Sequence, residues 1–135
     1  MRELMVPISP GELIDKITIL EIKSQRMSDP AKLANVRTEL ELLVATWRAW
    51  EHASSDIDSD WQALRSVNEQ LWDIEDHIRD KERAAEFDGR FIELARAVYV
   101  TNDERAAIKK RINARLGSAL VEEKSYADYR RPGAP

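Results

Sequence analysis

The chain of 135 residues contains no cysteine, which excludes disulfide bonds and thiolate metal ligands. It also lacks an apolar run approaching the roughly 20 residues that a helix needs to cross a bilayer. No apolar stretch follows the first charge, at Arg2, as it would in a secretory signal. These absences predict a cytoplasmic protein with no membrane association.

Turn-forming residues are scarce as well, with four glycines and five prolines. Few turns imply long uninterrupted elements, which favours helices over many short strands. A third of the residues are charged, yet the net charge is only −4. That mixture is typical of solvated helix faces, so we expect no nucleic-acid partner. The length fits a single domain spanning residues 1–135.

A first helix is predicted over residues 9–28, after an extended lead-in at 1–8. Ser9 can cap it, Pro10 occupies the first helical position, and Glu12 can reach back to the Ser9 amide to complete a capping box. Apolar residues lie on more than one face of this helix, whereas packing against a single neighbouring helix requires only one apolar face.

Two further helices, over 29–51 and 59–86, carry apolar residues in heptad spacing, which predicts coiled-coil-like seams. Their seam positions are Leu33, Val36, Leu40, Leu43, Trp47 and Trp50, then Trp61, Leu64, Val67, Leu71, Ile74 and Ile78. If these helices form an antiparallel hairpin, Trp47 and Trp50 should lie beside Trp61 and bury a large apolar area together.

A fourth helix is predicted over 88–117, with a restart or kink favoured near Asn102, which resembles an N-cap followed by acidic residues. The alternative is one long helix that carries a polar layer. An irregular tail is expected over 118–135. Short strands at 5–8 and 120–129 could pair with each other.

These elements predict an all-α fold, an antiparallel helical bundle of three to four amphipathic helices with coiled-coil-like heptads. Sustained heptads often form seams between chains, so we favour a homodimer over a monomer.

Signatures of metal, cofactor and covalent chemistry are absent. Asp56-x-Asp58-x-Asp60 begins like a calcium loop, but Trp61 and Val67 stand where the glycine and the bidentate glutamate belong. The two histidines are in no zinc motif, and there is no Gly-x-Ser-x-Gly or phosphate loop. We expect no metal and no cofactor. The basic run between Arg105 and Arg115 is interpreted as a solvated helix face.

Polar residues form a second stripe beside the apolar seam of 59–86, a similar stripe occurs over 88–117, and the first helix offers further charged residues. Asparagine is a poor residue for a helix interior unless its side chain has a partner. If the stripes converge, they form a pocket between helices. Exposed ion-paired faces, or a buried polar network that fixes helix register, are the structural alternatives. The candidate ligand-binding residues are Lys16, Lys23, Asn68, Trp72, Glu75, Arg79, Glu82, Asn102, Lys109 and Asn113.

Two functions follow from these patterns. The first is a protein-interaction or oligomerisation module, whose polar stripes set register and partner choice. The second is a binder or small enzyme for an anionic metabolite, in which Lys16, Lys23, Arg79 and Lys109 hold the anion. There Glu75 and Glu82 would orient those cations or transfer protons. Because no reaction machinery is recognisable, the interaction module is favoured.

Several segments together resemble a family of small bacterial proteins of unknown function. They are Val6–Leu20, Asn68–Arg79, Phe91–Ala95, Asn102–Ala106 and Glu122–Tyr126. The resemblance covers nearly the whole chain and implies a bacterial, single-domain protein, but it carries no activity, cofactor or substrate. A weaker similarity to the first helix of helical chorismate mutases, over Leu13–Ile17 with Leu20 and Arg26, does not extend to the rest of the chain.

Overall fold

The computed structural model describes residues 2–131, whose regular structure is entirely helical. Its elements are α1 Pro10–Arg26, α2 Pro30–Ala49, the short 3-10 helix η1 Ser55–Ile57, α3 Asp58–Arg83 and α4 Gly89–Arg115. The predicted all-α class is confirmed. Pairing of 5–8 with 120–129 as strands is wrong, because both segments are exposed and no strand occurs within 2–131.

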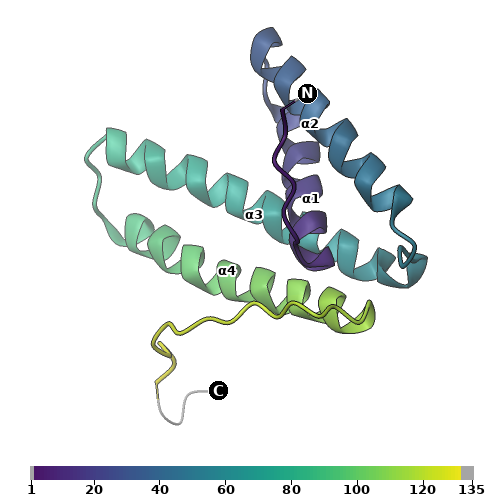
Figure 1. The fold of residues 1–135 in the computed structure, drawn as a ribbon. Helices are drawn as coiled ribbons and strands as arrows, with labels where there is room; N and C mark the ends of the chain where they lie inside the picture. Colours follow the sequence, from purple (N-terminus) through teal and green to yellow (C-terminus); the bar gives the residue numbers. More distant parts are fainter. Residues whose placement is uncertain (1, 132–135) are drawn as a thin grey trace.

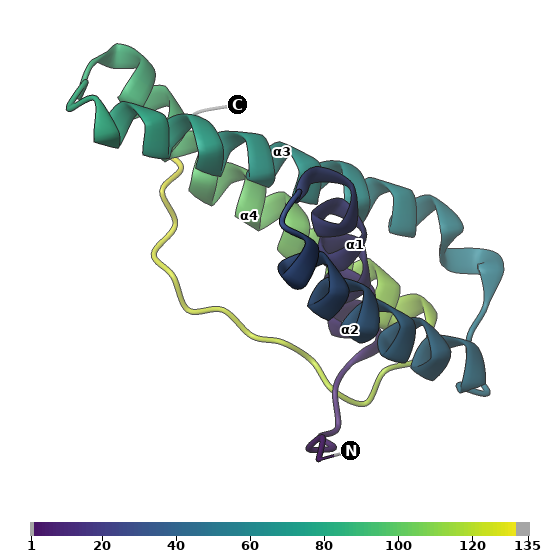
Figure 2. The same cartoon turned by 90° about the horizontal axis from the view of Figure 1, so that it is seen from above.

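Consecutive helices pair in two hairpins, α1 with α2 and α3 with α4. Figure 1 shows the first hairpin standing steeply against one end of the second, and Figure 2 shows the same arrangement from above. α1 packs against all three other helices, whereas the backbone of α2 approaches only α1. The predicted antiparallel bundle with a hairpin of the second and third helices is therefore not confirmed. Residues 27–29 are too short a connection for α2 to pack anywhere but beside α1.

The core lies where α1 crosses α3 and α4. Its buried members are Leu13, Ile14, Ile17, Ile57, Leu64, Val67, Ile108 and Ile112. Tryptophans extend this core toward α2: the ring of Trp47 lies 5.7 Å from that of Trp61 and 5.9 Å from that of Trp50. The expected grouping of the three indoles is present, although only side chains connect α2 to α3.

Polar caps set where three of the helices begin. Ser9, Asp29 and Asp88 each accept a hydrogen bond from the backbone N–H three residues further on, at 3.2, 2.9 and 3.0 Å. These bonds satisfy N–H groups that the first helical turn leaves free. The second half of the predicted capping box is wrong, because the Glu12 carboxylate pairs with Lys109 Nζ at 2.7 Å instead.

α4 is one continuous helix, so the restart predicted near Asn102 is wrong. Thr101 is buried, and Asn102 Oδ1 accepts a hydrogen bond from Arg105 at 3.5 Å instead of capping a backbone N–H. The alternative, a long helix that carries a polar layer, describes α4 correctly.

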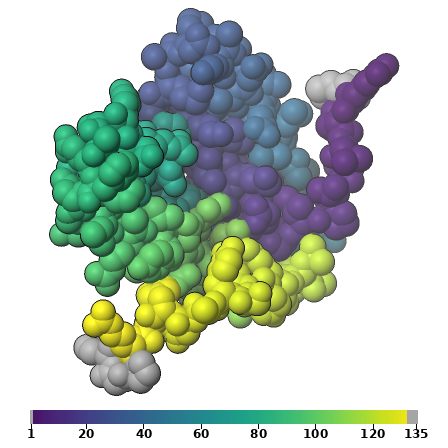
Figure 3. Space-filling view, turned by 90° about the vertical axis from the view of Figure 1, so that its left-hand side faces the viewer, coloured from purple at the N-terminus to yellow at the C-terminus, as the bar shows by residue number. Residues whose placement is uncertain are grey.

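Extended segments flank the helices on both sides. Figure 3 shows the N-terminal segment projecting as an arm, while the C-terminal segment lies against α4. The arm is apolar and open to water, with Leu4 86% and Met5 81% exposed. Among the described residues, no helix combines the length and apolar character that a membrane span requires.

α1 and α4 lie very close together at Gly11. Its N–H donates to Asn113 Oδ1 at 2.7 Å, which satisfies another free donor of the first turn of α1. A Cβ atom at this position would lie 2.6 Å from the Lys109 carbonyl oxygen and 2.8 Å from Asn113 Oδ1. Because a backbone carbonyl cannot rotate aside like a side chain, only glycine permits this approach.

We therefore expect Gly11→Ala to push α1 away from α4 and to lower the free energy of unfolding by about 1–3 kcal/mol, the usual cost of overpacking. Urea denaturation followed by circular dichroism measures this loss. Gly89→Ala is the matched control, because nothing lies within 4 Å of a Cβ there. Equal stability of the two variants would contradict the close approach of α1 to α4.

Candidate functional site

A buried carboxylate, Asp15, is the centre of the most concentrated polar cluster in the structure. It projects from α1 among core residues and is 1% exposed. Arg105 of α4 holds both carboxylate oxygens, with Nε donating to Oδ1 at 2.9 Å and Nη2 donating to Oδ2. Asn68 of α3 donates a third hydrogen bond at 2.9 Å. One side chain thus connects three helices.

Two further residues complete this Asp15 network. Thr18 is fully buried one turn further along α1, and its hydroxyl oxygen accepts a hydrogen bond from Asn68 at 2.9 Å. Lys109 of α4 lies 2.7 Å from the Glu12 carboxylate and 3.7 Å from that of Asp15. A third carboxylate, that of Glu122 in the C-terminal segment, approaches Lys109 Nζ to 3.3 Å.

The network keeps its members charged. Burial raises the pKa of Asp15, but hydrogen bonds from Arg105 and Asn68 and the charges of Arg105 and Lys109 outweigh it, so this pKa lies below its ordinary value of 3.8. The hydrogen bond to Asp15 raises the pKa of Arg105. Burial lowers the pKa of Lys109, yet its bond to Glu12 and the charges of its three carboxylate neighbours raise it overall. Asp15 is therefore ionised at neutral pH and does not accept protons there.

A second ion-paired cluster attaches the opposite face of α4 to α3. Asp60 is 6% exposed and lies 3.1 Å from Arg111 and 3.0 Å from Arg115. The prediction that the basic run 105–115 is a solvated face holds for the exposed Lys110, Arg111 and Arg115 and is wrong for Arg105 and Lys109. Arg105 and Lys109 enter the Asp15 network, and Arg111 and Arg115 pair with Asp60. Lys110 alone of the run stays exposed without an ion pair in the described structure.

A polar pocket of about 220 Å³ opens from the Asp15 network toward solvent, where α1, α4 and the C-terminal segment meet. The residues that line this polar pocket are Glu12, Asn102, Arg105, Ala106, Lys109, Glu122 and Lys124. Lys124 has no carboxylate partner within the part of the chain that the structure describes. Around the polar pocket, three cations thus balance three carboxylates: Arg105, Lys109 and Lys124 against Glu12, Asp15 and Glu122.

Four of the ten predicted site residues gather here. Asn68, Lys109 and Asn113 are buried, and Asn102 lies at the rim of the polar pocket. The positions of these four residues fit both interpretations of the polar stripes, a buried polar network and a ligand pocket.

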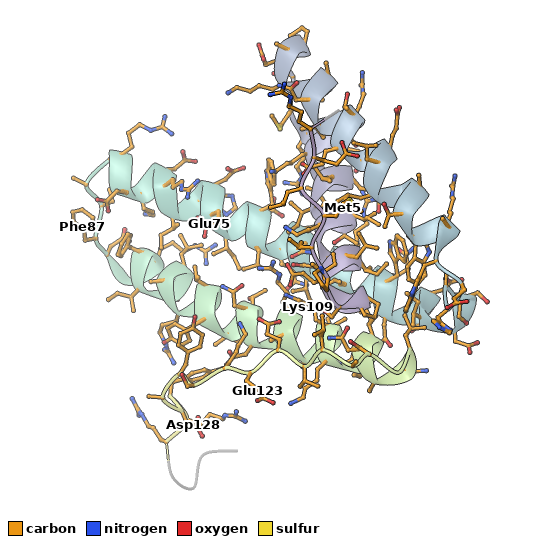
Figure 4. The ribbon with its side chains drawn as sticks, viewed as in Figure 1. Met5, Glu75, Phe87, Lys109, Glu123 and Asp128 are labelled. Carbon is orange, nitrogen blue, oxygen red and sulfur yellow. The ribbon has the colours of Figure 1, made fainter. Side chains whose placement is uncertain are left out.

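The other six lie elsewhere. Figure 4 shows Glu75 far along α3 from Lys109. Glu75 pairs with the exposed Arg79 at 3.2 Å, and Trp72 lies under Arg26. Lys16 and Glu82 are exposed and Lys23 is half-buried, none of them lining the pocket.

The predicted set of ligand-binding residues did not include those that organise the site, namely Asp15, Thr18, Arg105, Gly11 and Glu122. A signal existed for four of them. Gly11, Asp15 and Thr18 share a helical stripe with Ile22, and an acidic residue on a core-facing stripe requires a cationic partner. Arg105 lies one turn before the core residue Ile108, so it was a cation available to pair with Asp15. Glu122 lies after the last helix, where no periodic pattern of apolar residues could indicate which side chains face the protein.

The chemistry that these groups support is binding. Asp15 Oδ1 accepts from Arg105 and Asn68, and Oδ2 accepts from Arg105 with Lys109 Nζ 3.7 Å away, so this carboxylate holds groups of its own chain in place. In residues 2–131 no histidines or carboxylates are grouped in threes so as to hold a metal ion. Lys109, Arg105 and Lys124 offer N–H donors around a small cavity, an arrangement suited to an anion.

We expect Asp15→Asn to lower the free energy of unfolding by about 3 kcal/mol at neutral pH, since it leaves Arg105 and Lys109 without their buried carboxylate. This value is at the lower end of the usual cost of removing one partner of a buried ion pair, because the Arg105 side chain is 28% exposed. A folded-state pKa below 3.8 means that the contribution of Asp15 is present above that pH and is lost as pH falls through the lowered pKa.

Denaturant titrations of wild type and Asp15→Asn between pH 2 and 7 measure both effects, and the two stability curves should converge at the acid end. Asp80→Asn is the control, because it breaks an exposed pair with Arg83. A constant offset between wild type and Asp15→Asn over the whole range would contradict a lowered pKa for Asp15.

Comparison with known proteins supplies the family. No curated protein matches the chain, and no solved structure matches it. Residues 4–133 match a protein family over nearly the whole length, both extended segments included. This extent confirms the predicted membership in a family without an assigned function. The chain belongs to the family of unknown function (DUF6165).

Proposed function

We propose that this domain is an oligomerisation module in which α2 pairs with α2 of a second copy. The proposal depends on how little of α2 is covered: of its 20 residues only Val36 is buried. Leu42 remains 41% exposed. A helix stabilised by its own chain on one side only is typical of subunit interfaces.

A shallow groove runs along one side of α2 and is complementary to itself; four of its residues are exposed, while Leu40 and Val44 are half-buried because they also pack against the core. It is lined by Leu40, Glu41, Val44, Ala45, Arg48 and Ala49. A twofold axis between positions 44 and 45 would place Glu41 opposite Arg48, Val44 opposite Ala45 and Leu40 opposite Ala49. Each groove residue then meets another groove residue of the partner, as an isologous interface requires. This pairing of opposite charges and of large with small side chains is the observation that carries the proposal.

The charges make the proposed pairing selective. Glu41 and Arg48 are both exposed, and neither has an ion-pair partner among the described residues of its own chain. In a parallel arrangement of two α2 helices in register, each charge would face its like, which is unfavourable. The apolar groove residues supply affinity, and the charges select the antiparallel orientation.

We expect Arg48→Glu to raise the dimer dissociation constant at least about tenfold, because two attractive pairs become repulsive and each is worth several tenths of a kcal/mol. Adding Glu41→Arg to the same chain restores opposite charges and should recover most of the affinity. Sedimentation equilibrium measures both constants.

Lys32→Glu, the same change in charge at the far end of α2, is the control. A wild-type protein that stays monomeric at several hundred micromolar would refute the proposal. So would a double variant that is no tighter than Arg48→Glu.

A second candidate function is binding of a small anionic molecule in the polar pocket. The observation that favours it is the concentration of Arg105, Lys109 and Lys124 around one cavity that opens to solvent. The two functions use different surfaces, α2 for one and the junction of α1 with α4 for the other, so one chain can carry both.

A further inference from the structure

Three carboxylates surround Lys109, and they differ in how firmly they are held. Glu12 and Asp15 project from α1, which is fixed by the core. Glu122 belongs to a segment without helix or strand in which every residue from 119 to 131 is exposed. The Glu122 side chain is itself 46% exposed, and Lys109 is its sole ion-pair partner in the described structure. It is thus the one carboxylate that can leave without disturbing a helix.

The surroundings of Lys109 show what would replace Glu122. Without Glu122, Lys109 Nζ keeps the Glu12 carboxylate at 2.7 Å but loses the carboxylate at 3.3 Å. The Lys109 side chain is only 9% exposed, so few water molecules can take the vacated place. An N–H donor of a mostly buried ammonium group is unfavourable without an acceptor, and a carboxylate is a strong acceptor for it.

The cost of removing Glu122 is small. A partly exposed ion pair contributes between about zero and 1 kcal/mol. A molecule that brings its own carboxylate and also contacts Asn102 and Arg105 of α4 can therefore displace it. The pocket volume of about 220 Å³ admits a molecule of a few carbon atoms.

We propose that Glu122 is an internal stand-in for the ligand, that the polar pocket takes a small carboxylate-bearing metabolite, and that ligand entry frees residues 119–124 from α4. This inference rests on the second proposed function, ligand binding in the polar pocket. The far end of the segment stays attached, because the ring of Tyr129 lies 4.9 Å from that of Tyr99 on α4. Release is therefore local, as in a lid with one fixed end.

Propionate is the appropriate probe, because it has the chemical structure of the end of the Glu122 side chain. We would titrate it into ¹⁵N-labelled full-length protein, with ionic strength held constant by chloride. Amide shifts at 105–109 report binding, and heteronuclear relaxation at 119–124 reports release. Wild type should show both. Glu122→Gln should bind propionate about two- to fivefold more tightly, because the competing carboxylate is gone, and its segment should already be mobile.

Glu123→Gln is the matched control: it removes a neighbouring carboxylate that has no ion pair in the described residues, and it should behave like wild type. Lys109→Met should abolish binding; if that variant does not fold, the comparison of the two glutamine variants decides. Binding without a change at 119–124, or weaker binding by Glu122→Gln, would overturn the stand-in role and leave the ligand site intact. No propionate-dependent shift in either wild type or Glu122→Gln would overturn both.

Discussion

Asp15 is ionised in a place where water cannot reach it, and the arrangement of α1, α3 and α4 supplies the groups that compensate it. A buried carboxylate costs several kcal/mol unless it is paired and fully hydrogen-bonded. Arg105 of α4 and Asn68 of α3 provide those bonds, and both are available only when α1 crosses the α3–α4 hairpin at its observed position. Apolar contacts drive the helices together, but they tolerate several registers. The Asp15 network selects one of them.

The same crossing creates the polar pocket. Gly11 lets the start of α1 approach α4 closely enough for Glu12 to reach Lys109, and the C-terminal segment then encloses the cavity from the third side. α2 is not involved, since its backbone approaches only α1. The polar pocket and the largely exposed α2 thus lie in different regions of the molecule, and α1 is the element that contacts both.

The helices themselves could be predicted from the sequence, because caps and periodic apolar residues are local signals. Ser9 caps the first helix as expected. Pairing could not be predicted: the seams of α2 and α3 have the same spacing, and either could face the other or α1. The continuity of α4 was obscured for a related reason. Asn102 has the residue type of a cap, and only the position of Arg105 one turn later shows that its side chain has a different partner. Within the site, Asn68, Lys109 and Asn113 stood out as polar residues beside apolar stripes. On the same α3 stripe, Trp72 contacts the last residue of α1, Arg26, and Glu75 and Arg79 pair with each other instead. Asp15 and Arg105 were missed because an isolated charge on a helix is usually solvated, and their pairing spans 90 residues.

If the Asp15 network fixes the helix crossing, Asp15 and Arg105 stabilise it as a pair and not as independent residues. A double-mutant cycle with Asp15→Asn and Arg105→Met measures their coupling, from the unfolding free energies of wild type, both single variants and the double variant. Each single variant should be strongly destabilised, and the double variant should lose about 2 kcal/mol less than the sum of the two, because the pair is then absent as a whole. Strictly additive losses would show that the network is not what fixes α1 across α3 and α4.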